Sequence, residues 1–173
     1  MRNKNMGYDY RKILLPEGQT HLNACWAASI SWWTQAMSLN YKRSWQTQID
    51  LLAEFNQYAA NGGGIYGSGI RTVCESAKIR MYLQYLSPSR LKTDFDFSSP
   101  SIIIYNYPAA GGTHMNVIFD QQKDTVICME PFYPLVASGR TGERFGTYIR
   151  RPLSFFVNSQ EIGIGCLPLT DSY

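Results

Sequence analysis

The stretch that decides the fold is Gln19-Thr20-His21-Leu22-Asn23 followed by ACWAASISWWTQAMSL, residues 24–39. The second part is apolar on most faces of a helix, and a helix that is apolar all round is usually buried at the centre of a domain. Asn23 is of the residue type that caps helix N-termini, and Asn40 can close the far end. We therefore expect a buried central helix that begins just after Asn23.

Cys25 lies in the first turn of this expected helix. Free N–H groups and the helix dipole favour an anion there, so the thiolate form is stabilised. On its own, a cysteine in such a helix is more often inert core filling. Gln19, however, precedes Cys25 by 25 − 19 = 6 residues. Its amide can join the Cys25 N–H in an oxyanion hole, so this pair points to nucleophilic catalysis.

The rest of the first half is also helical in pattern. A helix over Thr47–Ala60 is indicated by its 3.6-residue period and by the capping-box pair Thr47 and Asp50. The run Asn61–Gly64 then stops this helix, and a third helix is expected over about Ser68–Lys78.

The second half has the pattern of strands. Three are indicated clearly, at Ser101–Tyr107, His114–Asp120 and Thr125–Glu130, and weaker candidates follow at Arg144–Arg150, Leu153–Asn158 and Ile162–Leu169. Helices first and an antiparallel sheet second make an α+β arrangement. We expect one domain over residues 1–173, with a helical lobe over about 1–85 and a sheet lobe over about 95–173.

Composition narrows the classes of function. The 173 residues are 45% hydrophobic and 17% charged, which is typical of a folded domain. No apolar run reaches the roughly 20 residues of a membrane span, and a net charge of +3 argues against nucleic acid. Four scattered cysteines give no metal-site spacing, and we expect neither metal nor cofactor. The N-terminus lacks an apolar signal segment, so we expect synthesis in the cytoplasm, with export by another route left open.

A catalytic base is sought among only two histidines. His21 is expected to be peripheral, whereas His114 opens a strand that leads through a turn to a second strand ending at Glu130. A three-residue turn that pairs Asp120 with Asp124 would set His114 opposite Glu130. A four-residue turn would set the two side chains on opposite faces unless a bulge intervened. Asn116 shares the face of His114 and is the alternative partner for its imidazole.

In this order, the segment Gln19-x5-Cys25-Trp26, then His114 and then Glu130-Pro131 resemble the active-site residues of the papain-like cysteine peptidases. The separation of 114 − 25 = 89 residues is more like the compact bacterial members, the bacteriocin leader peptidases and the avirulence proteases of plant pathogens. The resemblance implies a papain-like fold, with Cys25 as nucleophile, His114 as acid and base, Glu130 orienting His114, and Gln19 in the oxyanion hole.

The resemblance also covers a glycine segment and an aromatic residue. Gly62, Gly63 and Gly64 are similar to the family's glycine segment, which pairs with an extended peptide substrate, although they also serve as a plain helix stop. Phe132 is similar in position to an aromatic that shields the histidine from water, or it is a core residue. The family's signature has a further cysteine where this chain has Leu22.

The sequence therefore predicts a cysteine protease that cleaves peptide or amide bonds, with a polypeptide as its partner and a role as a secreted bacterial effector or toxin. Two alternatives remain. One is another acyl transfer at the same site, by a deamidase, transglutaminase or amidase; the other is a catalytically dead peptide-binding module. The oligomeric state is open, and the other cysteines are expected to be buried small residues: Cys74, Cys128 and Cys166.

Overall fold

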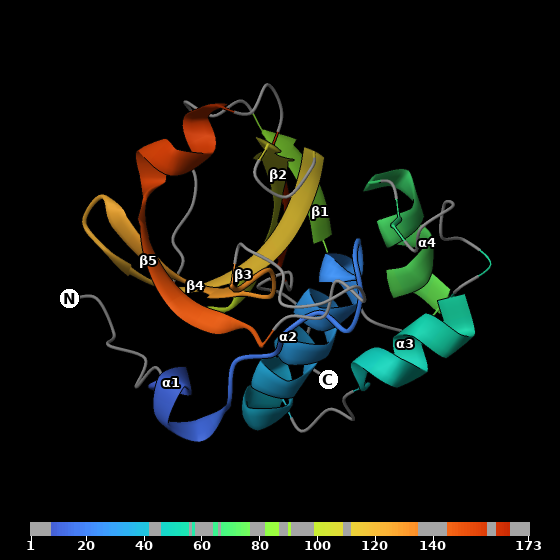
Figure 1. Cartoon of the computed structure of the whole chain (residues 1–173). Helices are drawn as coiled ribbons and strands as arrows, with labels where there is room; N and C mark the ends of the chain where they lie inside the picture. The colour runs from blue at the N-terminus through green and yellow to red at the C-terminus, as the bar shows by residue number, and fades with distance from the viewer. Residues whose placement is uncertain are drawn as a thin grey trace.

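The computed structural model describes residues 8–41, 46–55, 57, 64–65, 67–76, 82–86, 90, 99–108, 112–134, 145–158 and 162–166. Helices lead and strands follow, as Figure 1 shows. The elements are, in chain order, α1 (Tyr10–Ile13), α2 (Cys25–Tyr41), α3 (Gln48–Phe55), α4 (Gly67–Ser76), β1 (Tyr82–Leu86), β2 (Ser101–Tyr107), β3 (Gly112–Gln122), β4 (Thr125–Glu130), β5 (Thr147–Pro152), the 3-10 helix η3 (Leu153–Asn158) and β6 (Ile162–Cys166). The α+β arrangement expected from the sequence is confirmed.

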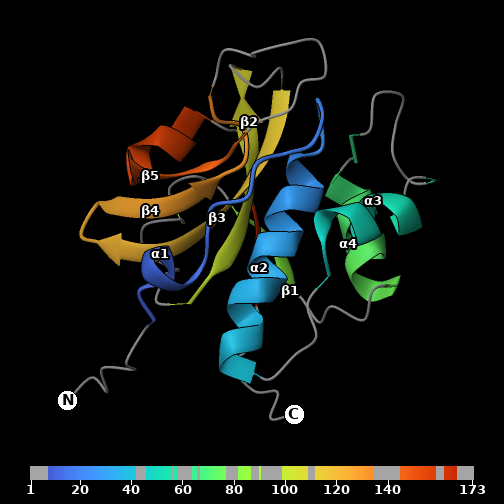
Figure 2. The same ribbon diagram turned by 60° about the horizontal axis from the view of Figure 1, so that its bottom comes forward.

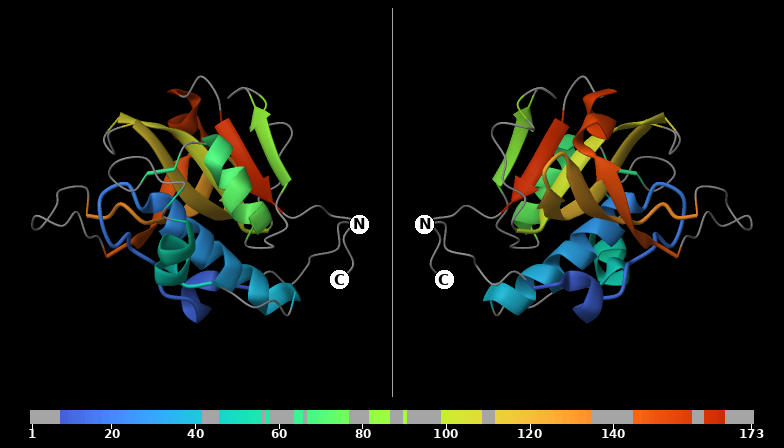
Figure 3. Two further views of the ribbon diagram at one scale, coloured as in Figure 1. Left: turned by 90° about the vertical axis from the view of Figure 1, so that its right-hand side faces the viewer. Right: turned by 90° about the vertical axis from the view of Figure 1, so that its left-hand side faces the viewer.

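The six strands form one antiparallel sheet in the order β1-β6-β2-β3-β4-β5. Helix α2 lies against one face of this sheet, and α3 and α4 lie to the side of α2 (Figures 1 and 2). The two side views of Figure 3 show the sheet and α2 from opposite directions. On the other face, Leu153 and Phe156 of η3 pack against buried residues of the central strands. The central strands β2, β3 and β4 are therefore buried on both faces.

The central helix α2 is fixed by its aromatic and hydroxyl side chains. Trp32 and Trp33 are fully buried, and the Trp33 indole N–H donates to the Pro100 carbonyl at 2.9 Å. The Ser29 hydroxyl donates to the backbone carbonyl of Met115 on β3, also at 2.9 Å. Because Ser29 is one turn after Cys25 and Met115 follows His114, this buried bond fixes the start of α2 relative to β3.

Several sequence predictions are confirmed. Helix α2 is present, β2 and β4 have the expected bounds, and α4 covers most of its expected range. The capping box is present, since the Asp50 N–H donates to Thr47 Oγ1 at 3.1 Å and the Thr47 N–H to Asp50 Oδ2 at 3.2 Å. Helix α3 itself ends at Phe55, and most of the remaining residues up to Ala60 lie outside the described part.

Other sequence predictions are wrong. Leu153–Asn158 was expected as a strand and is a 3-10 helix, because Leu153 and Phe156, three residues apart, both turn into the core. Strand β1 was not expected, and it begins at Tyr82, within the range expected for the helical lobe.

In the part of the chain that the structure describes, no helix has the length and apolar character needed to cross a membrane.

Candidate active site

Cys25 is the first residue of α2 and so lies in the first turn of the helix, where the sequence predicts it. The Ala24 carbonyl accepts the first helical hydrogen bond, from the Ala28 N–H at 3.2 Å, so Ala24 is the residue directly before the helix. Asn23, expected in that place, lies one residue earlier with φ 69°, in the left-handed region. Cys25 is partly exposed, unlike the fully buried Cys128.

His114 and Glu130 are brought to the same face by a β-bulge. Near the turn Asp120 pairs with Ile127, and that register continued would leave Glu130 on the face away from His114. The register shifts by one residue at Phe119, after which Val117 pairs with Met129. Glu130 then lies opposite Asn116 and diagonal to His114, a separation that the long glutamate side chain can span.

The turn between these strands is shorter than either of the two considered from the sequence. Three- and four-residue turns were weighed, the latter with a bulge, whereas only Lys123 and Asp124 lie between the paired residues Gln122 and Thr125, and a bulge is present. Lys123 has φ 57°, a conformation typical of such tight turns. In the register set by this turn, Glu130 and His114 would lie on opposite faces of the sheet, and the bulge brings them to the same face.

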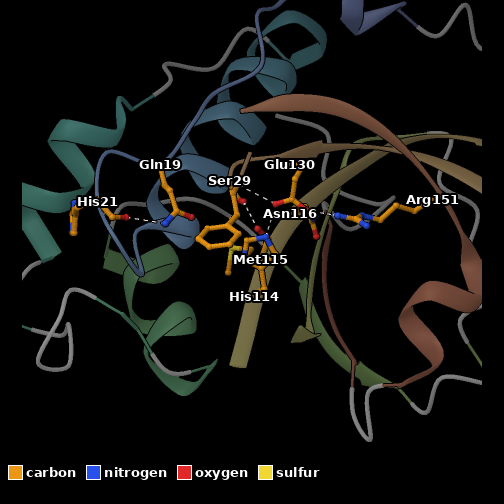
Figure 4. A network of polar contacts seen from close by, with 9 residues as sticks. Gln19, His21, Ser29, His114, Met115, Asn116, Glu130 and Arg151 are labelled. Atoms are coloured by element: carbon orange, nitrogen blue, oxygen red, sulfur yellow. Dashed lines mark hydrogen bonds and ion pairs between the residues drawn. The ribbon is translucent and has the colours of Figure 1, made fainter. Parts of the chain in front are cut away.

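Glu130 Oε1 lies 2.6 Å from His114 Nε2 and also accepts the Phe132 N–H at 3.0 Å. Its other oxygen, Oε2, accepts from the Asn116 amide at 2.8 Å and from Arg151 Nη2 at 2.9 Å. Of the two candidate partners of His114, Glu130 is the one that contacts its imidazole, and Asn116 contacts Glu130 instead. Figure 4 shows this network passing from His114 through the carboxylate to Arg151.

Arg151 was not expected from the sequence. It lies on β5, pairs with Val126 and is only 8% exposed. Its guanidinium stacks over the Phe155 ring at 3.9 Å and lies 5.3 Å from the Tyr107 ring centroid. The expected strand ended at Arg150, which is exposed, so the alternation along β5 is the only sequence signal that separates the two arginines.

Charge in this network favours a protonated His114. Burial alone lowers the pKa of the imidazolium, but the charge of the Cys25 sulfur, its hydrogen bond with the ring and the Glu130 carboxylate outweigh burial and raise that pKa to about 9. Burial likewise raises the pKa of Glu130, yet the hydrogen bond and charge of His114, with the bonds from Phe132 and Arg151, hold it below its ordinary value. His114 therefore interacts with Cys25 at one end and with Glu130 at the other.

Gln19 lies between the start of α2 and the end of β4. Its Nε2 donates to the His21 carbonyl at 2.9 Å, and the same carbonyl accepts the Ala24 N–H at 3.2 Å, next to Cys25. The backbone N–H of Gln19 donates to the Pro131 carbonyl at 3.1 Å, next to Glu130. The side chain is 1% exposed, and one amide hydrogen is left after the bond to His21.

Three aromatic rings surround the His114 imidazole. The ring centroids of Tyr107, Tyr105 and Phe132 lie at 5.6, 5.8 and 5.9 Å from that of His114. Phe132 is buried, its ring meets that of His114 edge-on, and its backbone N–H donates to Glu130. This position agrees with both expectations for Phe132, a shield for the histidine and a core residue. The two tyrosines were not identified from the sequence, where they look like ordinary strand residues.

Only some of the glycines and cysteines singled out from the sequence lie in the described part of the chain. Gly64 is described, and a Cβ built on it would lie 3.3 Å from Asn23 Cβ, so its backbone passes close to the start of α2. Gly62 and Gly63 lie outside the described residues, as do the side chains of Cys74 and Cys166. Cys128 is fully buried, and burial raises the pKa of its thiol, which makes it inert as the sequence suggested.

His21 lies at the edge of this group, with its ring Nδ1 at 3.1 Å from the Thr20 hydroxyl and its side chain partly exposed. Among the residues that the structure describes, no three His, Cys, Asp or Glu side chains gather where they could hold a metal ion. The arrangement offers a thiol, an acid–base group and an oriented amide donor, which together suit acyl transfer.

The solved structures of similar fold include two peptidase domains. The peptidase domain of Streptococcus ComA, a bifunctional ABC transporter involved in a quorum-sensing pathway, aligns with a TM-score of 0.60 over 89% of this chain and 98% of its own, at 13% identity. The fold is that of the papain-like cysteine peptidases. A double-glycine-motif protease from an AMS/PCAT transporter, solved with its leader peptide, aligns with a TM-score of 0.55 over 88% and 91% of the two chains, at 18% identity.

No protein-family model and no curated protein matches the sequence. The papain-like resemblance drawn from Gln19, Cys25, His114 and Glu130 is nevertheless confirmed at the level of the fold, and both structural neighbours are of the transporter-peptidase kind rather than the larger cathepsin kind.

Proposed function

We propose that this protein is a cysteine peptidase that hydrolyses peptide bonds, with Cys25 as nucleophile. The observation that carries the proposal is the position of His114, which interacts with the Cys25 sulfur on one side and with Glu130 Oε1 at 2.6 Å on the other. A buried imidazole joined to a partly exposed thiol and to a buried carboxylate is the arrangement that activates a thiol nucleophile.

In the first step the Cys25 thiolate attacks the peptide carbonyl, and a sulfur–carbon bond forms. The resulting oxyanion accepts hydrogen bonds from the Cys25 N–H and from the second Nε2 hydrogen of Gln19. The carbon–nitrogen bond then breaks, and the His114 imidazolium gives its proton to the leaving amine. The acyl group remains on Cys25 as a thioester.

In the second step His114, now neutral, takes a proton from water as the water attacks the thioester. The sulfur–carbon bond breaks, and the thiolate and the imidazolium are restored. Glu130 holds the imidazole with Nε2 toward itself throughout, which leaves Nδ1 as the nitrogen that faces Cys25.

The substrate class we propose is an extended peptide with small residues before the cut. The neighbour solved with a leader peptide is a double-glycine-motif protease, which supports this choice. Gly64 passes close to Asn23 at the start of α2, where a glycine backbone lets a peptide approach. The role of an exported effector or toxin, drawn from the family resemblance, stays a prediction.

The proposal is tested with a synthetic peptide that contains two consecutive glycines, followed by mass spectrometry. We expect two fragments whose masses sum to the peptide plus one water, and no fragments with the Cys25→Ala variant. Cleavage by Cys25→Ala at the rate of the unmodified chain would refute the proposal. Transfer of the acyl group to an added amine instead of water would identify the site as a transferase, the first alternative.

A further inference from the structure

Gln48, outside the proposed catalytic group, binds the chain on both sides of Gln19. It is the first residue of α3 and is only 5% exposed. Its Nε2 donates to the Gly18 carbonyl at 3.0 Å, and its Oε1 accepts the Thr20 N–H at 2.9 Å. One side-chain amide thus bridges the two residues that flank Gln19, across about 30 positions of sequence.

The same amide is itself held in place. Its Nε2 lies 3.3 Å from Glu17 Oε1, and the Thr20 hydroxyl lies 3.3 Å from its Oε1. Glu17 is fixed from the other side by the Ser31 hydroxyl at 2.8 Å and the Gln35 amide at 3.1 Å, both from α2. Segment 17–20 is therefore tied to α2 and α3 together.

The side chain of Gln19 needs this support because its own bonds are few. Among the described residues its buried Oε1 has no hydrogen-bond partner, and its Nε2 has one, the His21 carbonyl. Buried amides are normally satisfied at both ends, so the side chain is held in place by the backbone that carries it. An oxyanion donor must be placed to within a fraction of an ångström, and misplacement of such a group is costly for the rate.

We propose that Gln48 is a positioning residue for the oxyanion hole: it fixes the backbone at Gly18 and Thr20 and so aims the amide of Gln19. This inference rests on the proposed peptidase function. It predicts that loss of Gln48 slows reactions that pass through an oxyanion and spares reactions of the Cys25 thiol that do not.

Two reactions of Cys25 make this separation. Acylation by p-nitrophenyl acetate passes through a tetrahedral oxyanion, whereas alkylation by iodoacetamide occurs at a saturated carbon and forms none. For Gln48→Met, which has nearly the same shape, we expect acylation to slow by about 10- to 100-fold while the alkylation rate stays within about twofold. Both rates are read at Cys25 by peptide mass spectrometry, with Cys25→Ala as the blank.

Gln35→Met is the matched control. It removes an amide of the same size that also binds Glu17 but, in the contacts described, bridges neither Gly18 nor Thr20. Because the Ser31 hydroxyl still binds Glu17 at 2.8 Å, we expect acylation to slow far less in this variant than in Gln48→Met, and alkylation to stay the same. Gln19→Ala should slow acylation as Gln48→Met does, and the double variant should be no slower than Gln19→Ala alone, because the two residues act through one hydrogen bond.

Two outcomes would contradict the positioning role of Gln48. Equal losses of acylation and alkylation in Gln48→Met, or no loss of acylation, would overturn the positioning role while leaving the proposed function intact. If circular dichroism shows that Gln48→Met does not fold, Gln48→Glu keeps the acceptor for Thr20 and removes the donor to Gly18, and the same comparison applies. A Cys25 in the unmodified chain that is alkylated no faster than free cysteine would overturn both proposals.

Discussion

Arg151 Nη2 lies 2.9 Å from Glu130 Oε2, while His114 Nε2 lies 2.6 Å from Glu130 Oε1. The carboxylate is 1% exposed, so a negative charge there needs compensation. With a thiolate at Cys25 and an imidazolium at His114, Glu130 would leave the group with a net charge of −1, and Arg151 brings it to zero. An amide in place of Glu130 would not need the arginine. The contact with Arg151 therefore explains how a buried, charged glutamate is accommodated beside His114.

The charge balance predicts how the Glu130–Arg151 pair responds to substitution. Arg151→Met leaves a buried carboxylate without its cation, and we expect a loss of about 3–5 kcal/mol in the free energy of unfolding. The double variant Glu130→Gln/Arg151→Met removes both charges and should be more stable than Arg151→Met alone. Urea unfolding measures both, and Arg150→Met, at the exposed neighbour, should change little. A double variant less stable than Arg151→Met would contradict this account.

The pH dependence of His114 follows from its raised pKa of about 9. Because this lies above the ordinary value of 6.5, protonation of His114 stabilises the folded chain fully below about pH 6.5, and the contribution is lost as pH rises through about 9. Cys25→Ala removes two of the causes that raise the pKa, so the pKa of His114 should fall. NMR titration of the imidazole ring protons measures this pKa directly. The chain has only two histidines, so the signals that remain in a His21→Gln variant are those of His114.

The same titration bears on catalysis. His114 must be protonated to donate to the leaving amine, so peptide hydrolysis should decline above about pH 9, where that proton is lost. A rate that continues to rise above pH 9 would show that another group supplies the proton.

Gly64 provides a test of substrate contact. Gly64→Ala places a Cβ 3.3 Å from Asn23 Cβ, a tight contact that either residue can relieve by a small shift. If a peptide pairs with this backbone, we expect KM to increase several-fold with a smaller change in kcat. The alkylation rate of Cys25 is the control and should be unaffected. An unchanged KM would remove Gly64 from the binding site.

Gly146 provides a test of the Gln19 segment. It has φ 72°, and a Cβ on it would lie 2.5 Å from the Glu17 carbonyl carbon, so Gly146→Ala must displace residues 17–18. We expect a loss of at least about 1–3 kcal/mol in the free energy of unfolding and slower acylation of Cys25. Gly112→Ala is the control, because φ is also positive there but nothing lies within 4 Å of the new Cβ. Gly146→Ala should therefore be the less stable of the two variants in urea.

The residues that the sequence made predictable are those with a local signature. Cys25 was identified by its place at a helix start, and β2 and β4 by β-branched runs next to proline or turn residues. Glu130 was identified as the polar residue that ends the strand after the turn, and the bulge at Phe119 places it on the same face as His114. The observed register differs by an even number of residues from the register of a three-residue turn without a bulge, so Glu130 lies on the same face as His114 in both.

The residues that were missed act across elements. Arg151 reaches Glu130 only because β5 pairs with β4, and the sequence between those strands carries no signal that fixes the pairing. Gln48 binds backbone groups of Gly18 and Thr20, so no residue type at its partners marks it. Supporting contacts of this kind depend on tertiary geometry, which a pattern of residue types along the chain does not contain.

The position of Arg151 in chain order also affects when the contacts around Glu130 can be completed during synthesis. Cys25, His114 and Glu130 all leave the ribosome before Arg151 does, and Arg151 reaches the carboxylate only once β5 has paired with β4. A Glu130 carboxylate that became buried before then would lack its cation, and burial without a cation favours the neutral form of a carboxyl group. We therefore expect the full set of contacts around Glu130 to form only after β5 has been synthesised and has paired with β4.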